Sequence, residues 1–452
     1  MQKTVLTKAV AVALATLGAG AAFAQSSVTI YGNLDVAVDS VHKGQGDVAA
    51  STLFSTLAAN SASFNSGFVA KSSVTRVTSS ISSVNALGFK GTEDIGGGYK
   101  AGFVLEGQFQ LDTGAQSGQD GRMWGRQAFV GLTTPYGEVR LGRQYAPMFY
   151  AFATATVEAL GGADIMGSGL IVNNLQVRQD NQVSYWLKAG DLTAALSFSP
   201  NAGVDRYLSS TRMPTTVNSG SAGSTAGSNT GQIAGGASAG TESADTGGRG
   251  RSVGVYLNYN VDPALMVNFG YHNNKFGNAT LITGSGSALY TPLAELDKYS
   301  AYSLGAKYVV PGAGTQLAGI YHLGKFSNDS GQVGGPKIST LALGVKHPID
   351  KFAVGAEFAY SKFTNFTKGK DTSLMLMGDY NFSKRTKVYL RAGYVKDSAG
   401  DAAATGSGVN VVGGPLPLLT GFGSVETPFF SAAGANIDAT TRVVAVGIRH
   451  QF

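Results

Sequence analysis

Hydrophobic and polar residues alternate along most of this chain with a period of two. From Val28 to Val36, the odd positions hold Thr, Tyr, Asn and Asp, whereas the even positions hold apolar residues or Gly. Such a period places successive side chains on opposite faces of a β-strand. The pattern therefore predicts an all-β protein whose strands each have one polar and one apolar face. Similar alternation occurs over residues 103–111, 253–261, 265–272, 302–309, 317–323, 341–346, 352–361, 374–382, 388–396 and 444–452.

Short and long connections alternate between the predicted strands. The short ones, such as Pro135–Gly137 and Asp262-Pro263, contain the Gly, Pro and Asp that tight turns require. A soluble β-sandwich has no reason to gather its short turns at one end, whereas outer-membrane barrels have short periplasmic turns and long external loops. The sequence therefore predicts a transmembrane antiparallel β-barrel of about 16 strands, with both chain ends on the short-turn side. The long connections lie roughly at 42–82, 112–122, 146–180, 200–250, 276–298, 327–336, 363–370 and 397–439.

The first 24 residues have the features of a secretory signal peptide. A basic start with Lys3 and Lys8 leads into an apolar run, and Ala22-Phe23-Ala24 fits the cleavage pattern. We expect residues 1–24 to be removed and residues 25–452 to form the barrel in the outer membrane. After residue 24 no uninterrupted apolar stretch of about 18 residues occurs, which excludes a helical membrane protein.

Charge and candidate chemistry narrow the function further. The formal net charge is +6, and removal of the signal peptide takes away two lysines. The remaining basic residues are scattered along the chain, which argues against a nucleic-acid partner. The chain has no Cys, which excludes disulfides and thiol chemistry. Its five His residues show no H-x-x-x-H spacing, and no G-x-S-x-G motif is present. We therefore expect no enzyme, no cofactor and no metal site; a barrel hydrolase remains a remote alternative.

Five segments carry specific motifs: Ser27–Gly32, Leu87–Asp94, Gly125–Leu132, Leu141–Tyr145 and Val446–Phe452. Together they resemble the Gram-negative trimeric porin family, especially its Neisseria- and Burkholderia-like branch. The resemblance implies a homotrimer in outer-membrane lipid and lipopolysaccharide, with a channel for passive diffusion of ions and small hydrophilic solutes in each subunit. It also implies that the barrel-assembly machinery recognises the terminal Phe452. A substrate-specific channel, or a surface receptor or adhesin barrel, remains the alternative.

The resemblance further implies that the third long loop folds into the barrel and narrows it. Glu158 and Asp164, which flank a pair of glycines, are expected on the acidic side of this constriction. The alternative is that they are two solvated acids on an exposed loop. The basic side is expected to consist of Arg126, Arg140, Arg178, Arg143 and Lys90. The wider lumen potential is expected to depend on Glu106, Glu357, Lys346, Arg391 and Arg449.

Two details of the basic side need separate arguments. The strand parity of Arg126 is ambiguous, and we expect Arg126 to face inward and Phe129 outward. An unpaired arginine that faces hydrocarbon costs about 2–4 kcal/mol at mid-depth. Ala86 stands where the family often has an arginine. We therefore expect a constriction with one basic group fewer and a milder selectivity.

Overall fold

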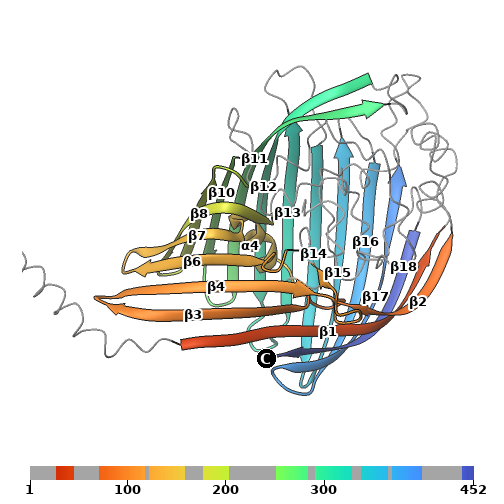
Figure 1. Ribbon diagram of the computed structural model, residues 1–452. Helices are drawn as coiled ribbons and strands as arrows, with labels where there is room; N and C mark the ends of the chain where they lie inside the picture. The colour runs from red at the N-terminus through yellow and green to blue at the C-terminus, as the bar shows by residue number, and fades with distance from the viewer. Residues whose placement is uncertain are drawn as a thin grey trace, which may run out of the picture.

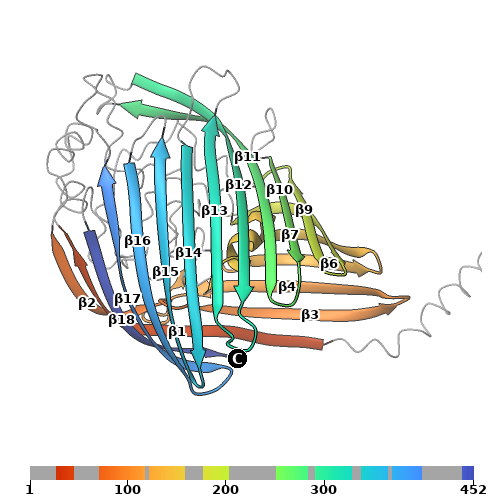
Figure 2. The same ribbon diagram turned by 180° about the vertical axis from the view of Figure 1, so that it is seen from behind.

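The chain forms one antiparallel β-sheet that closes on itself. A computed structural model describes residues 27–44, 71–117, 122–157, 177–202, 251–283, 291–327, 337–364, 369–399 and 440–452. Successive strands are paired around the ring, and the first strand, β1, pairs with the last, β18. Figure 1 and Figure 2 show this ring from opposite sides. The predicted all-β barrel is therefore confirmed.

The elements have the following bounds. The strands are β1 (Ser27–Lys43), β2 (Ser72–Ser79), β3 (Ala86–Gly96), β4 (Tyr99–Phe109), β5 (Gln116–Ser117), β6 (Gln127–Thr134), β7 (Gly137–Tyr145), β8 (Arg178–Ala189), β9 (Leu192–Ser199), β10 (Ser252–Asn260), β11 (Leu265–Thr283), β12 (Thr291–Val309), β13 (Gln316–Ser327), β14 (Lys337–Ile349), β15 (Phe352–Thr364), β16 (Gly369–Asn381), β17 (Thr386–Ala399) and β18 (Thr440–Gln451). The helix is α4 (Pro147–Thr154). Among the described residues, no helix has the length and apolar content needed to span a bilayer.

The wall of the barrel has sixteen strand positions, as predicted. The strands β2 and β3 occupy one position between them, because both pair with β1, one after the other along its length. The two-residue strand β5 pairs only with the end of β4 and adds no position of its own.

The predicted alternation places apolar side chains on the outside of the barrel. In β18, Val444, Val446 and Ile448 are 50%, 58% and 45% exposed, whereas Val443 and Ala445 are 1% exposed. The exposed set faces outward, as a lipid-facing band requires, and the buried set faces the lumen. The short turns lie together at one end, which we call the short-turn end. There, glycines such as Gly312 and Gly314 adopt positive φ.

Three predicted loops are partly strand, and these predictions were wrong. Strand β2 lies within 42–82, and the short strand β5 lies within 112–122. In the predicted loop 276–298, β11 continues to Thr283 and β12 begins at Thr291. The cross-strand pairing of β11 and β12 continues beyond the alternating segment. Period-two alternation is lost there because a strand that extends past the bilayer has water on both faces. Residues 1–24 and most of 200–250 and 397–439 lie outside the described residues, so the predictions for them stay predictions.

Between β2 and β3 the chain leaves the sheet, and Asp35 of β1 holds this excursion. The Asp35 carboxylate accepts hydrogen bonds from the backbone N–H groups of Ile81, Ser82 and Ser83 at 3.0, 3.1 and 2.9 Å. It also accepts one from the hydroxyl of Tyr389 on β17 at 2.6 Å. Side-chain acceptors thus replace the cross-strand partners that these backbone groups lack. We call this arrangement the Asp35 clasp.

The barrel seam closes at the carboxyl terminus. The backbone N–H of Gly32 donates to the carbonyl of Phe452 at 3.1 Å, and the N–H of Phe452 donates to the carbonyl of Gly32 at 3.2 Å. A Cβ atom added at Gly32 would lie 2.5 Å from the Phe452 ring and 2.6 Å from the backbone carbonyl oxygen of Ala86. The absence of a side chain at Gly32 therefore makes room both for this ring and for the neighbouring strand.

We expect Gly32→Ala to lower the free energy of unfolding by about 1–3 kcal/mol, because the added methyl group overpacks the seam. Urea unfolding of the detergent-folded barrel, followed by tryptophan fluorescence, measures the change. Gly378→Ala is the matched control, because a Cβ atom there meets nothing within 4 Å. Equal midpoints for the two variants would show that the seam accommodates the added methyl group without cost, contrary to this interpretation.

Candidate functional site

The chain that follows β7 turns into the lumen and lies against the inner wall. The backbone N–H of Ala146 donates to the carbonyl of Val177 at 2.9 Å, and α4 begins directly afterwards with Pro147. Proline suits the first turn of a helix because its missing N–H would have no helical partner there. Helix α4 packs against β9, β10, β11 and β12 (Figure 1). The expected infolding of the third long loop is thus confirmed for residues 146–157.

A track of glycines on the wall makes room for this segment. They are Gly254 on β10, Gly270 on β11, Gly305 on β12 and Gly344 on β14. Cβ atoms added at these positions would lie 2.5 to 2.9 Å from atoms of Pro147, Ala151, Ala155 and Val157. Any larger residue would push the segment further into the channel, so the glycines set how far the loop narrows the lumen.

Three polar side chains fasten the same segment. Asn268 on β11 donates from Nδ2 to the carbonyl of Ala151 at 3.0 Å and to Oγ1 of Thr154 at 2.7 Å. Lys307 on β12 donates to the carbonyl of Thr156 at 2.8 Å. The backbone N–H of Val157 donates to Oε1 of Glu357 on β15 at 3.4 Å. The segment is therefore held from β11 across to β15.

Aromatic rings fill the space beneath the start of the segment. Tyr145 and Phe149 are stacked with centroids 4.2 Å apart, and Tyr150 meets Trp186 edge to face at 4.7 Å. Burial raises the pKa of the Tyr150 hydroxyl to about 12, so it is neutral at physiological pH. This end of the loop rests on an uncharged aromatic base, and its charged neighbours are the arginines of the wall.

Arg126 lies on the lumen side in a buried ion pair. Its Nε donates to Oε1 of Glu106 at 2.5 Å, and the hydroxyl of Tyr31 donates to Oε2 of the same carboxylate at 2.8 Å. Arg126 and Glu106 are each 7% exposed. A charge this close to its counter-charge contributes little net potential, although the pair fixes both side chains.

The expected outward position of Phe129 is wrong. Phe129 is 9% exposed, and the guanidinium of Arg140 lies over its ring at 5.3 Å, whereas Val130 is 58% exposed. The reason is that Arg126 precedes β6, so it is not bound by the parity of that strand. Arg126 and Phe129 can therefore both face the lumen.

Arg178 joins Arg126 around one aromatic ring. The guanidinium of Arg178 lies 4.9 Å from the centroid of Tyr145 and donates to its hydroxyl at 3.3 Å. The guanidinium of Arg126 lies 5.8 Å from the same centroid. The structure thus brings these two predicted residues together. We call Arg126, Arg178 and Tyr145 the arginine wall.

The other predicted basic residues lie in separate contacts. Arg140 donates to Glu138 at 2.8 Å, and Arg143 sits in a β-bulge, ion-paired with Asp180. Lys90 lies 5.1 Å from the centroid of Tyr31. These three residues therefore do not share the arginine wall.

Of the remaining residues predicted at the constriction, Ala86 is described by the structure and the two acidic residues are not. Ala86 is 6% exposed on β3, opposite Gln108 of β4. Glu158 and Asp164 lie outside the described residues, so their place opposite the arginines stays a prediction.

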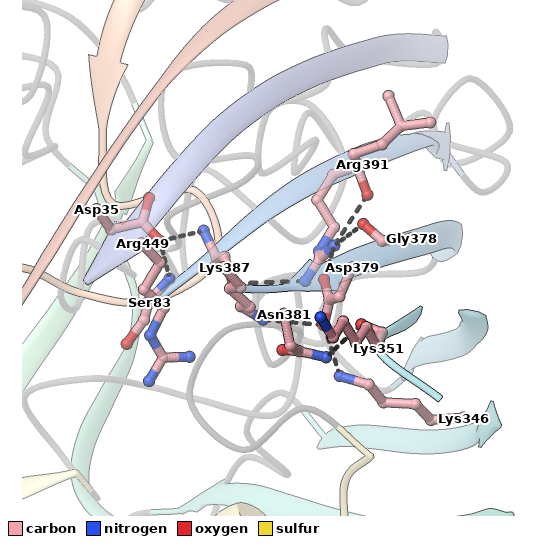
Figure 3. Close-up of polar contacts among 12 residues, drawn as sticks. Asp35, Ser83, Lys346, Lys351, Gly378, Asp379, Asn381, Lys387, Arg391 and Arg449 are labelled. Atoms are coloured by element: carbon pink, nitrogen blue, oxygen red, sulfur yellow. Dashed lines mark hydrogen bonds and ion pairs between the residues drawn. The ribbon is translucent and has the colours of Figure 1, made fainter. Parts of the chain in front are cut away.

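A second charged cluster, which the sequence analysis missed as a unit, lies near the short-turn end of the lumen. Lys346 of β14, Lys387 of β17 and Arg391 of β17 bind the carboxylate of Asp379 on β16 at 2.9, 3.0 and 2.8 Å. Figure 3 shows these side chains around Asp379, with Asp35 beside them. Strand parity could have placed Asp379 in the lumen, but only the register of β14 to β17 brings the three cations to it.

The charges of the described lumen are unbalanced toward positive. The carboxylates of Asp39, Glu106, Glu138, Asp180 and Asp379 are each ion-paired with a base, whereas those of Asp35 and Glu357 accept hydrogen bonds from backbone N–H groups. Lys90, Arg178, Lys307 and Arg449 have no ion-paired carboxylate among the described residues. No group of three or more His, Asp or Glu residues in the described part of the chain could hold a metal ion.

Comparison with known proteins identifies related chains. The family model described as "Gram-negative porin" matches residues 9–400. Outer membrane porin protein 32 of Delftia acidovorans is 27% identical over 450 residues, which cover 98% of this chain and 99% of that protein. An outer membrane porin protein of Bordetella pertussis is 36% identical over 188 residues, 41% of this chain and 44% of that protein. The structure of an anion-selective porin from Comamonas acidovorans superposes with a TM-score of 0.60 at 25% identity, covering 95% of this chain and all of the other.

We expect Asn268→Ala to increase the open-channel current noise and the frequency of brief closures in a planar bilayer. The substitution removes two hydrogen bonds to the infolded segment, each worth about 1 kcal/mol. Asn258→Ala is the matched control, because Asn258 lies on the lumen face of neighbouring β10 and its Oδ1 has no hydrogen-bond partner in the described part of the chain. If both variants gave wild-type noise, Asn268 would not hold the segment.

Proposed function

The chain belongs to the Gram-negative porin family, and from this premise we propose that the arginine wall and the infolded loop form a constriction that favours anions. The protein is an outer-membrane porin, whose barrel encloses a water-filled channel for passive diffusion of ions and small hydrophilic solutes. The observation that carries the proposal is the positive imbalance of the described lumen charges. The short-turn end is then the periplasmic end.

Fixed charges act on solutes through the potential that they create in the channel. Arg178 and Lys90 have no ion-paired carboxylate among the described residues, so their charge is not neutralised locally and raises the concentration of anions near the wall. Contacts with a passing ion stay weak, because throughput requires that a solute leaves as readily as it enters. The channel is therefore a filter by charge and size, with no catalytic role in the proposal.

Glu158 and Asp164 supply the acidic side in this proposal. Both residues follow the segment that ends at Val157. The backbone N–H of Val157 donates to Glu357, which lies on the wall opposite the arginines. Opposed charges would create a field across the narrowest section that orients dipolar solutes. Because Ala86 contributes no charge beside the wall, we expect an anion preference that is mild. The anion-selective porin from Comamonas acidovorans supports the sign of this preference.

The assembly forms a further part of the proposal. We propose a homotrimer, which the trimeric form of a structurally similar Vibrio cholerae protein supports at the level of fold. Phe452, which closes the seam against Gly32, is proposed as the signal for the barrel-assembly machinery. The outward apolar band is proposed to contact outer-membrane lipid and lipopolysaccharide. Residues 1–24 are proposed to be the export signal.

We expect Arg126→Ser to shift the anion-to-cation permeability ratio toward cations by roughly fifteenfold. The substitution leaves the Glu106 carboxylate without its counter-charge, and a charge about 5 Å from the ion path in water disfavours an anion and favours a cation by about 0.8 kcal/mol each, which changes the ratio by about 1.6 kcal/mol. Reversal potentials under a salt gradient give the ratio. Glu106→Gln should shift it the opposite way, and Arg385→Ser, on an exposed turn, should leave it unchanged. Equal ratios in all four proteins would remove the arginine wall from the constriction.

We expect the folded protein to migrate as a trimer on an SDS gel when unheated and as a monomer after boiling. Barrels that associate through large apolar surfaces resist SDS until they unfold. Cross-linking before boiling provides the control, because it should preserve the trimer band. Migration as a monomer in both unheated and cross-linked samples would contradict the proposed assembly.

A further inference from the structure

Asp379 binds more bases than its carboxylate needs. Arg391 binds Oδ1 of Asp379 at 2.8 Å, and this one base would already neutralise the carboxylate. Lys346 and Lys387 both bind the second oxygen, Oδ2, at 2.9 and 3.0 Å. Figure 3 shows the three bases around Asp379. We call these four residues the Asp379 cluster, in which three positive charges meet one negative charge.

The register of β14, β15 and β16 brings the two lysines close together. Lys346 on β14 reaches across β15 to Asp379 on β16, over two small residues on the lumen face of β15. Ala353 is the cross-strand partner of Asp379. Gly355 is the partner of Lys346. Because Lys346 and Lys387 bind the same oxygen, their ammonium nitrogens lie no more than about 6 Å apart, where two positive charges repel each other.

The lysines of the cluster reach the water of the lumen, whereas the groups behind them do not. The side chains of Lys346 and Lys387 are 18% and 13% exposed. Those of Arg391 and Asp379 are 1% and 3% exposed. Lys346 has three ammonium hydrogens and donates only to Asp379 in the described part of the chain. Lys387 and Arg391 have further contacts in the protein. A solute in the lumen can therefore accept a hydrogen bond from Lys346 beside the charge of Lys387.

The Asp379 cluster lies at another depth of the channel than the arginine wall. Lys346 lies near the end of β14, and Lys387 is next to Thr386, where β17 begins. Both strand ends lead into short turns, so the cluster is at the periplasmic mouth. Tyr145 and Arg178 of the arginine wall lie at the opposite ends of their strands, away from the short turns. An anion that crosses the channel therefore meets two separate groups of positive charge.

We propose that Lys346 and Lys387 bind a divalent oxyanion, of the class of inorganic phosphate, at the periplasmic mouth. Two oxygens of one dianion can each accept a charge-assisted hydrogen bond from one ammonium group. A monovalent anion offsets less of the repulsion between the lysines, so the site selects by charge. An ammonium group is a compact point charge, which does not demand the planar geometry that an arginine fork matches. Binding is weak enough for release, as a channel requires.

This inference rests on the diffusion channel of the proposed function and not on the arginine wall. A dianion held at the mouth offsets the positive charge that attracts chloride there. It also stands in the path of chloride ions that leave or enter the channel. Occupancy of the site should therefore lower the chloride current.

The test measures the chloride conductance of single channels in a planar bilayer while inorganic phosphate is added at constant ionic strength. The solution is mildly alkaline, so that phosphate is a dianion. We expect Lys346→Gln/Lys387→Gln to raise the concentration of phosphate that gives half of the effect at least about tenfold, because two contacts to a charged group are lost. Acetate, a monovalent oxyanion, should have a much smaller effect on the wild type.

Lys351→Gln/Lys384→Gln is the matched control, since it removes two lysines that are exposed on short turns at the same mouth. It should keep the wild-type response to phosphate. In Lys346→Gln/Lys387→Gln the carboxylate of Asp379 keeps Arg391 as its counter-charge. Lys346→Gln alone replaces this variant if the double substitution does not fold.

Thermal unfolding provides an independent readout. A ligand that binds the folded protein raises the unfolding midpoint. Phosphate should raise the midpoint of the wild type more than acetate does at equal ionic strength. The difference between the two anions should be lost in Lys346→Gln/Lys387→Gln and kept in the control.

Three results would overturn the proposal. They are a wild-type response to phosphate in Lys346→Gln/Lys387→Gln, equal effects of phosphate and acetate on the wild type, and loss of the phosphate effect in Arg126→Ser. The last result would place the site at the arginine wall. Reversal potentials separate this inference from the proposed function. A wild type that responds to phosphate through the two lysines but favours cations refutes only the anion-favouring constriction.

Discussion

Every backbone N–H and C=O group at membrane depth needs a partner within the protein, since lipid offers none. A sheet meets this requirement only when it has no edge, so the pairing of β1 with β18 is the contact on which the remaining structure depends. Closure also fixes the alternation of faces, because the register of each strand determines which side chains enter the lumen. The infolded segment, the arginine wall and the Asp379 cluster all take their positions from this ring.

Inside the barrel, burial against the wall determines which polar contacts the side chains make. A carboxylate on the lumen face is desolvated on the wall side and must find a base or a hydrogen-bond donor. Glu106 with Arg126 and Asp379 with three cations meet this need. The bases outnumber the acids that hold them in the described part of the lumen, and this surplus is the basis of the proposed anion preference. In that proposal, rigidity and selectivity arise from neighbouring side chains, because the ion pairs fix the wall and the remaining cations act on the solute.

Much of this architecture was predictable from local patterns. The alternation in β18 gave its two faces correctly, and the alternation of short turns and long loops gave the number of strand positions. Phe129 was predicted wrongly because Arg126 lies outside the strand whose parity was applied to it. The extensions of β11 and β12 were missed because period-two alternation needs one dry face. The Asp379 cluster depends on the register of β14 through β17, which local sequence does not contain. The placement of Glu158 and Asp164 rests on resemblance alone.

The Asp35 clasp has a consequence for the order in which the barrel assembles. Its hydrogen bond to Tyr389 joins residues that are 354 positions apart, and the other donors come from the excursion after β2. Contacts of such high sequence separation form only after the entropy of closing the intervening chain has been overcome. Before β18 pairs with both β1 and β17, the Asp35 carboxylate is hydrogen-bonded to water, because its donors in the folded barrel are not yet in place. The clasp is therefore a late contact of folding, and its formation marks a barrel that has closed.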